Sequence, residues 1–289
     1  MRRPFIRLLG ALLLSLSASA LAHPALWVAR QGSSTVYLFG TVHLLPHDTD
    51  WRFPALQKAL DQSQALYIEI TDDSQAHMTA LVLRYGLDPA HPLSSLLTQQ
   101  EQVRLAAAAK TAGVPGGSAT LNVMHPWLAA LTLSVAPLLK AGLDPRQGVD
   151  KQLKAQMSAD GKPVHGLENA AEQIRFFADM SPSLQLSFLR QTLDDTENAA
   201  TELKTLIDAW KRGDTDAIAR LESTELRQHD PRLYRILIVR RDQAWAVKIA
   251  SMLKQPGTIF VAVGAAHLAG PDSVQAALAA RGIRVQRLP

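Results

Sequence analysis

Short runs of apolar and β-branched residues in the first part of the chain predict the beginning of a β-sheet. The runs "LWVAR" (26–30) and "TVYLFG" (35–40) flank a Gly-Ser-Ser sequence (32–34), which predicts two strands joined by a tight turn. The run "ALYIEI" (65–70) predicts a third strand, after a segment with helical spacing that opens at Pro54. This order of strand, strand, helix and strand predicts a mixed sheet with helices on it.

The C-terminal part of the chain gives the clearest pattern. The run "TIFVAVG" (258–264) is apolar throughout, which is typical of a strand buried on both faces, so we expect it at the centre of the sheet. The run "PDSVQAALAARG" (271–282) predicts a helix with Gly282 just past its end. Apolar and polar residues alternate in "IRVQRL" (283–288), which predicts an edge strand.

Helical spacing dominates between these two groups of strands. It predicts a large helical insertion over about residues 74–160, with glycine and proline at each join. A short strand, "KPVHGLE" (162–168), follows, and Asn169 with Glu172 has the spacing of a capping box. The predicted helices are 54–62, 75–85, 99–111, 126–141, 150–157, 215–226 and 230–253, and a helix that opens at Asn169 is followed by further helices up to Gly213.

The fold class that this order indicates is α/β, with a central mixed sheet and helices packed around it. No Gly/Ser-rich or Pro-rich linker divides the chain, so we expect one domain over residues 23–289. No repeat of fixed period is visible, which argues against a solenoid or propeller.

The first 22 residues have the basic start, apolar middle and Ala-Leu-Ala ending of a secretory signal peptide. We expect cleavage after Ala22 and a periplasmic or secreted protein. No other stretch of about 18 residues, the length that a membrane span needs, is apolar throughout, so we expect no integral membrane span. The chain has no cysteine, which excludes disulfides and leaves nitrogen and oxygen atoms as metal ligands.

The charge balance argues against nucleic acid as a partner. The full chain has 30 basic and 26 acidic residues, but three arginines, Arg2, Arg3 and Arg7, lie in the expected signal peptide. Their loss leaves a net charge near +1, far from the strongly basic surface that binds phosphate backbones.

Two histidines follow predicted strands at the same spacing. His43 lies three residues after Gly40, and His267 lies three residues after Gly264. Ligands gather at the carboxyl ends of strands in sheets covered by helices, and glycine permits a sharp turn or a close approach there. The motif is short, so the spacing alone favours an incidental position for each histidine.

Glu69 strengthens the interpretation of a shared site. It lies near the carboxyl end of an otherwise apolar predicted strand, where a carboxylate is costly unless it is paired, bound to metal or near water.

Arg241 likewise interrupts an apolar stripe on its predicted helix. Two alternatives explain it: the guanidinium binds a carboxylate or an anionic ligand, or the side chain extends along its own stem to solvent. Glu168 and Asp150 each precede a predicted helix, where a helix-dipole interaction or an N-cap would explain them as well as a site would.

Several motifs resemble one family over nearly the whole length of the chain. "LFGTVHLLP", "LYIEI", "GVDKQL", "VHGLENAAEQIRFF", "RRDQAWAVKIA" and "FVAVGAAHLAGPDSV" are similar, in this order, to the TraB/GumN family, which includes the Tiki proteases. The sequence has no G-x-S-x-G, P-loop, H-E-x-x-H or G-x-G-x-x-G motif.

The resemblance implies a mixed α/β fold whose active centre contains His43, Glu69 and His267, with a divalent ion such as manganese, cobalt or zinc. The position of Arg241 resembles a helical Arg-Asn pair of the family, although Asp242 stands where asparagine is usual. More distant relatives of this fold include erythromycin esterases and a haem-binding lipoprotein, so the fold alone does not fix the chemistry.

Our first hypothesis is therefore a metal-dependent hydrolase, most readily a peptidase acting on a peptide or protein. Two imidazoles and a carboxylate suit a divalent ion that activates water, although Glu69 as a metal-free general base is also consistent with the sequence. A second hypothesis is a non-catalytic protein that binds haem, a metal ion or envelope polysaccharide in the same cleft. A third is a scaffold whose histidines only hold strand ends.

Overall fold

The computed structural model describes residues 23–195 and 199–289, so the expected signal peptide lies outside the described residues. Within them a six-stranded sheet has the strand order β4-β3-β5-β2-β1-β6. The strands are β1 (Leu26–Gln31), β2 (Ser34–Thr41), β3 (Ala65–Ile68), β4 (Val164–Gly166), β5 (Gly257–Gly264) and β6 (Val285–Arg287).

The sheet is mixed, as the sequence predicts. β2, β5, β3 and β4 run parallel to one another, whereas β1 pairs antiparallel with β2 and with β6. The apolar run around Val261 lies between β2 and β3, and β6 forms an edge, so both of these expectations are confirmed. The predicted turn at residues 32–34 joins β1 to β2 as a hairpin.

The strand predicted over residues 65–70 is too long by two residues. β3 ends at Ile68, and the chain bends at Glu69. Backbone pairing continues irregularly beyond this point, because the N–H groups of Leu167 and Glu168 donate to the carbonyls of Ile68 and Glu69 at 2.7 and 2.8 Å. Glu69 and Glu168 therefore leave the sheet next to each other.

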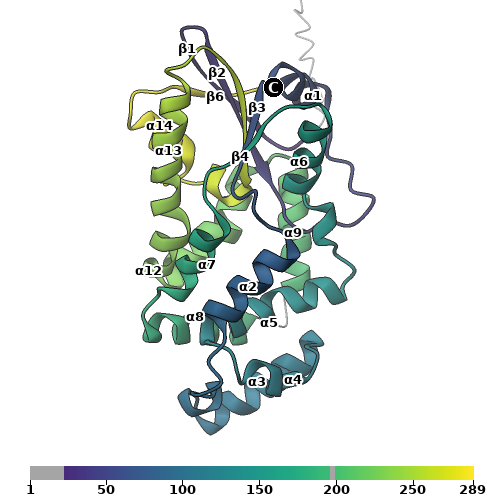
Figure 1. Cartoon of the computed structure of the whole chain (residues 1–289), viewed down its shortest axis with the longest axis vertical. Coiled ribbons are helices and arrows are strands. Elements are labelled where there is room, and N and C mark those ends of the chain that lie inside the picture. Colours follow the sequence, from purple (N-terminus) through teal and green to yellow (C-terminus); the bar gives the residue numbers. More distant parts are fainter. Residues whose placement is uncertain (1–22, 196–198) are drawn as a thin grey trace, which may run out of the picture.

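Helices cover both faces of the sheet (Figure 1). On one face α1 (Pro54–Gln62), α6 (Val149–Ala159) and α9 (Ala199–Lys211) contribute apolar residues to the largest core cluster. On the other face α13 (Arg240–Met252) and α14 (Val274–Ala279) pack against the sheet. The central strands are therefore buried on both sides, which explains their continuous apolar sequence.

A helical half lies beyond the carboxyl ends of the parallel strands (Figure 1). Its helices include α2 (Gln75–Gly86), α3 (Gln99–Ala112), α4 (Gly117–Leu121), α5 (Pro126–Lys140), α7 (Ala170–Ala178) and α8 (Pro182–Asp195). The capping box predicted at Asn169 and Glu172 is present at the start of α7. None of the described helices is long and apolar enough to cross a membrane.

The two helices predicted over residues 215–226 and 230–253 contain wider turns than the sequence suggests. α10 (Thr215–Ile218) continues into the π-helical segment η3 (Ala219–Thr224) and then α11 (Glu225–His229). α12 (Pro231–Tyr234) continues into the π-helical segment η4 (Arg235–Val239), which leads into α13. π-Helical turns are rare and often occur at functional sites.

Trp210 ties α9 to the strand that precedes His43. Its indole Nε1–H donates a 2.8 Å hydrogen bond to the carbonyl of Gly40, and its ring packs against Phe39 and Trp51. Because Gly40 lies past the end of the β1 pairing, this bond satisfies a buried carbonyl that β1 does not reach.

We predict that Trp210→Phe lowers the free energy of unfolding by about 1–3 kcal/mol more than Trp127→Phe does, since only the first leaves a buried carbonyl without a donor. Trp127 is a matched control because it is fully buried and its indole Nε1 has no partner among the described residues. Urea unfolding followed by circular dichroism measures both. Equal losses in the two variants would contradict the role given to this hydrogen bond.

Candidate active site

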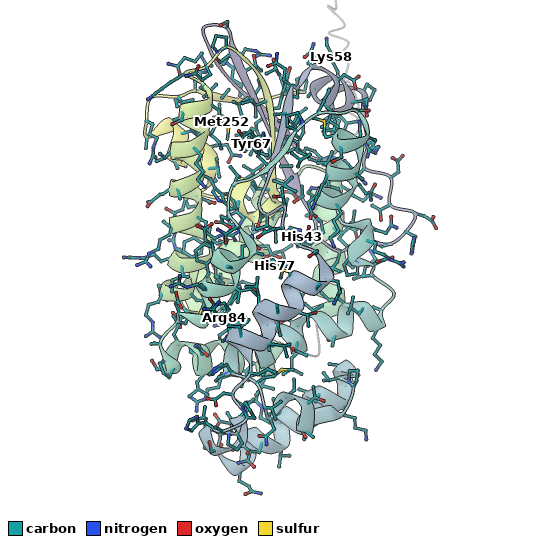
Figure 2. The ribbon with its side chains drawn as sticks, viewed as in Figure 1. His43, Lys58, Tyr67, His77, Arg84 and Met252 are labelled. Atoms are coloured by element: carbon teal, nitrogen blue, oxygen red, sulfur yellow. The ribbon has the colours of Figure 1, made fainter. Side chains whose placement is uncertain are left out.

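The three parallel strands β2, β5 and β3 deliver the predicted site residues to one edge of the sheet. Thr41 is paired with Gly264, and Ile68 with Ala262, so the three strands end nearly level with one another. His43 follows β2, Glu69 follows β3, and His267 lies in a short 3-10 turn after β5. Figure 2 shows His43 where the sheet meets the helical half.

The two glycines of the repeated motif, Gly40 and Gly264, allow neighbouring groups to pack closely against their backbone. A Cβ atom at Gly40 would lie 3.1 Å from the Cα of Ala265, so the two strand ends pack backbone against backbone. A Cβ atom at Gly264 would lie 3.2 Å from Oε1 of Glu69 and 3.5 Å from Cδ2 of His267. Neither glycine has a positive φ, so of the two roles expected from the sequence the structure supports close approach.

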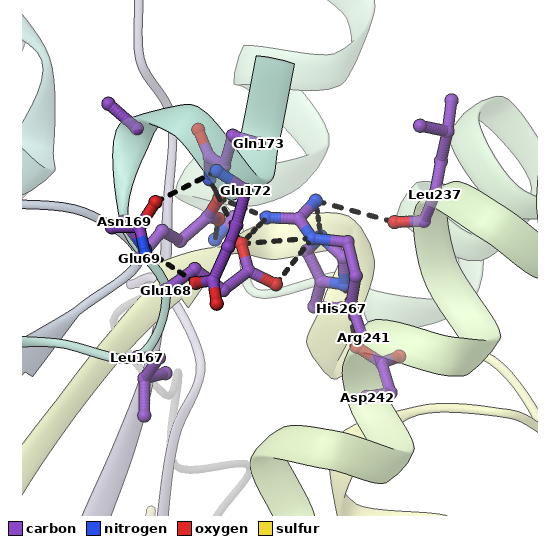
Figure 3. A network of polar contacts seen from close by, with 12 residues as sticks. Glu69, Leu167, Glu168, Asn169, Glu172, Gln173, Leu237, Arg241, Asp242 and His267 are labelled. Atoms are coloured by element: carbon purple, nitrogen blue, oxygen red, sulfur yellow. Dashed lines mark hydrogen bonds and ion pairs between the residues drawn. The ribbon is translucent and has the colours of Figure 1, made fainter. Parts of the chain in front are cut away.

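Arg241 is bound between two glutamates at the centre of the site (Figure 3). Its Nη2 donates to Oε2 of Glu69 at 2.7 Å and to Oε2 of Glu168 at 2.9 Å, and its Nε donates to Oε1 of Glu168 at 3.0 Å. The side chains of Arg241 and Glu69 are each 11% exposed. The arginine therefore binds carboxylates within the protein and does not extend to solvent, which decides between the two alternatives that the sequence left for Arg241.

The charges in this cluster stabilise one another. Burial opposes ionisation of Arg241, but Glu69 and Glu168 outweigh it and raise the pKa of the arginine above its usual range. Burial likewise raises the pKa of Glu69, but Arg241 and the two histidines outweigh it and hold that pKa well below its usual range. The N–H of Gly264 also donates to Oε1 of Glu69 at 2.7 Å. Glu69 is thus a fixed anion at neutral pH.

His267 is held on both ring nitrogens. Its Nδ1 lies 2.6 Å from Oδ1 of Asp242, and its Nε2 lies 3.1 Å from Nη1 of Arg241. Because a guanidinium only donates, Nε2 accepts and the ring proton sits on Nδ1, facing Asp242. Burial raises the pKa of Asp242 to about 6, with His267 opposing the rise. Asp242 therefore orients the ring of His267. The sequence indicates no role for Asp242, which stands where the family usually has asparagine.

His43 is held on one nitrogen and open on the other. Its Nδ1 lies 3.0 Å from Oδ1 of Asp150, and its Nε2 lies 4.0 Å from Oε1 of Glu69. Desolvation lowers the pKa of His43, but the bond to Asp150 and the charge of Glu69 outweigh it and raise the pKa to about 9. The side chain is 57% exposed, so solvent reaches the ring inside the cavity. Asp150 is not an N-cap, because α6 begins at Val149 and Gly148 occupies the cap position.

His43, Glu69, Arg241 and His267 line one cavity of about 380 Å³, together with leucines of α9. Several polar side chains that line one cavity are typical of a ligand or active site. The residues predicted from the sequence to form the site are therefore brought together.

Two polar residues of the site were not predicted from the sequence. Gln173 on α7 donates from Nε2 to Oε2 of Glu69 at 2.9 Å and to Oε2 of Glu168 at 3.3 Å. Its position one turn after the capping residue Asn169 was a usable signal, since that helix begins beside Glu168. Glu222 in η3 also lines the cavity, and nothing in its local sequence indicates this.

Comparison with known proteins identifies the family. The profile of the TraB/PrgY/gumN family matches residues 25–287. The chain belongs to this family. It is 27% identical to YbaP of Escherichia coli (strain K12), described as uncharacterized, over 252 residues that cover 87% of this chain and 90% of that protein. YbaP of Shigella flexneri matches with the same identity and coverage. No solved structure matches the chain significantly.

The donor atoms of this TraB/PrgY/gumN chain suit a divalent ion by chemical type. His43, Glu69 and His267 offer two imidazoles and a carboxylate, and each imidazole has its Nδ1 held by a carboxylate, as metal-binding histidines usually do. Among the side chains of the described residues no three acidic or histidine groups are placed so that they could hold a metal ion. Nη1 of Arg241 lies 3.1 Å from Nε2 of His267, so an ion on these three residues would require that guanidinium to move away.

We predict that Arg241→Met lowers the free energy of unfolding of this TraB/PrgY/gumN chain by about 3–5 kcal/mol, because it leaves two buried carboxylates without a counter-charge. The same substitution at Arg232 is the control, since that arginine pairs with Asp230 but is 64% exposed, and we expect it to cost about 0–1 kcal/mol. Chemical denaturation near pH 7 measures both.

A second variant tests the cause. Adding Glu168→Gln to Arg241→Met removes one of the two repelling charges, so we expect the double variant to recover about 0.5–3 kcal/mol relative to Arg241→Met alone. A double variant that is less stable than the single one would contradict the interpretation.

Proposed function

We propose that this chain is a hydrolase of peptide bonds that works with a divalent metal ion outside the cytoplasm. The observation that carries the proposal is the convergence of His43, Glu69 and His267 on one cavity, each held by a partner that fixes its orientation. The signal-like sequence of the first 22 residues supports the location.

His43, Glu69 and His267 would hold the ion. When bound, such an ion supplies Lewis-acid polarisation of a carbonyl and lowers the pKa of water. Binding requires that Nε2 of His43 be unprotonated, and the pKa of about 9 means that the proton must leave this nitrogen. Asp150 keeps Nε2 of His43 directed toward Glu69, and Asp242 fixes the tautomer of His267.

The remaining groups of the chain suit the charge changes of amide hydrolysis. A tetrahedral intermediate carries an oxyanion, and the guanidinium of Arg241 is a preorganised positive charge on the cavity wall. Glu168 accepts from both Nε and Nη2 of Arg241, so the arginine keeps an anchor when its contact with Glu69 or His267 changes. Ala265 and Ala266 leave the wall beside His267 small, which gives room for a substrate backbone.

The decisive experiment combines metal analysis with cleavage. The purified protein, lacking the first 22 residues, is assayed for bound metal and then incubated with a peptide library in the presence and absence of a chelator. We expect cleavage that the chelator abolishes and added manganese, cobalt or zinc restores. His43→Ala and Glu69→Gln should each reduce kcat/KM by at least about a hundredfold. Cleavage that is insensitive to chelator, with no bound metal, would refute the metal role and favour Glu69 as a metal-free base.

The aspartates behind the histidines give a finer test. We predict that Asp242→Ala weakens metal affinity by about 10–100-fold, whereas Asp242→Asn retains most of the affinity because its Oδ1 still accepts from Nδ1 of His267. Isothermal titration of the metal-free protein measures both constants. Equal losses in the two variants would mean that the charge of Asp242 matters and its orienting bond does not.

The same experiments separate hydrolysis from binding alone. A protein that binds haem, a metal ion or polysaccharide in this cavity without cleaving any peptide would be stabilised thermally by that ligand, and His43→Ala and His267→Ala would abolish the effect. That outcome would replace the proposed function with the binding hypothesis.

A further inference from the structure

A second cavity adjoins the one that holds the candidate site. It has a volume of about 360 Å³ and lies between α5, α8, α9 and the helical segment around residues 221–226. Four residues line both cavities: Leu203, Leu206, Glu222 and Leu226.

Glu222 is the charged group at this junction. It makes no hydrogen bond or ion pair with any residue in the described part of the chain. The Glu222 side chain is exposed to solvent at the cavity, and partial desolvation raises its pKa, with His267 opposing the rise and Glu225 adding to it. Glu225 and Glu202 line the second cavity, so further carboxylates lie beyond the junction.

No arginine or lysine among the described residues pairs with Glu222, and the charges of His267 and His43 in the same cavity act on it without a direct contact. Arg241 is the one arginine or lysine that lines either cavity there, and it is already bound by Glu69 and Glu168. Leucines from α9 and α11 line the cavity beside Glu222, together with polar residues such as Gln191 and Thr192. A carboxylate beside leucine side chains suits a lysine or arginine side chain, which has a charged end on an aliphatic stem.

Thr41 gives an independent indication that the cavity takes a polar ligand. It lines the first cavity, is 2% exposed, and its Oγ1 has no hydrogen-bond partner among the described residues. Side chains alternate along β2, so Thr41 lies on the same face as Phe39, which packs against Trp210 of α9. Buried hydroxyl groups nearly always have a partner, so this one is suited to a polar group of a ligand.

We propose that Glu222 holds the cationic end of a lysine or arginine side chain of the substrate, with the aliphatic stem of that side chain against Leu203 and Leu206. The inference rests on the proposed function, because it places a basic residue of the substrate next to the bond that is cleaved. It names the substrate class as peptides with a basic side chain near the cleavage site.

The test uses a peptide that the wild-type protein cleaves, blocked at both ends, in which each position is replaced in turn by lysine, norleucine or glutamate. At one position we expect lysine to exceed norleucine by about tenfold in kcat/KM, mainly through KM. Glu222→Gln should reduce the lysine preference by about tenfold. Glu222→Lys should shift the preference at that position to glutamate. Asp50→Asn, which removes a negative charge from an exposed loop, is the control and should leave the preference unchanged.

Binding is measured separately, so that failure of the subsite and failure of the hydrolase proposal can be told apart. The lysine peptide should stabilise the wild-type protein thermally more than the norleucine peptide does, and Glu222→Gln should remove the difference. If no peptide is cleaved but this difference is seen, the subsite stands and the hydrolase proposal falls. If cleavage occurs with the same lysine preference in wild type and Glu222→Gln, or depends on a free amino terminus instead, the subsite is overturned.

Discussion

The ion pair of Arg241 with Glu69 and Glu168 determines how the rest of the site is arranged. Two carboxylates emerge side by side from neighbouring strand ends, and without a cation between them they would repel each other in a poorly solvated place. The guanidinium joins them and also contacts His267, so one helical residue fixes the ends of three segments. The planar fork of arginine suits this task because it donates in several directions at once.

The two histidines are supported from opposite layers of the fold. Asp150, which bonds to His43, lies on α6 and one face of the sheet, whereas Asp242, which bonds to His267, lies on α13 and the other. The strands alone therefore bring the rings to the edge of the sheet, and the helical layers set their tautomers and directions. A shift of either helical layer against the sheet would change the orientation of one histidine ring without changing that of the other.

The sequence predicts the parts of this site that depend on local pattern. The strand-end positions of His43 and His267 follow from the apolar runs before them. The apolar stripe around Arg241 left two alternatives, a buried partner or extension to solvent, and the structure shows the first. The contribution of Glu222 depends on how a distant helical segment packs, which periodicity does not encode. The exact end of β3 was also missed, because Glu69 leaves the strand to meet Gly264 and Arg241, which are tertiary partners.

The pairing of β2 with β5 also determines the stage of synthesis and folding at which the site can form. β2 lies near the start of the described chain and β5 near its end, yet the two strands are hydrogen-bonded neighbours at the middle of the sheet. Such a long-range contact has a high cost in loop-closure entropy, and its formation is slow relative to local helix formation. The chain therefore completes the cavity only once synthesis has passed His267, the last residue of the cavity lining. A growing or truncated chain that lacks β5 also lacks Gly264 and His267, so the fold delays any chemistry at this site until the protein is whole.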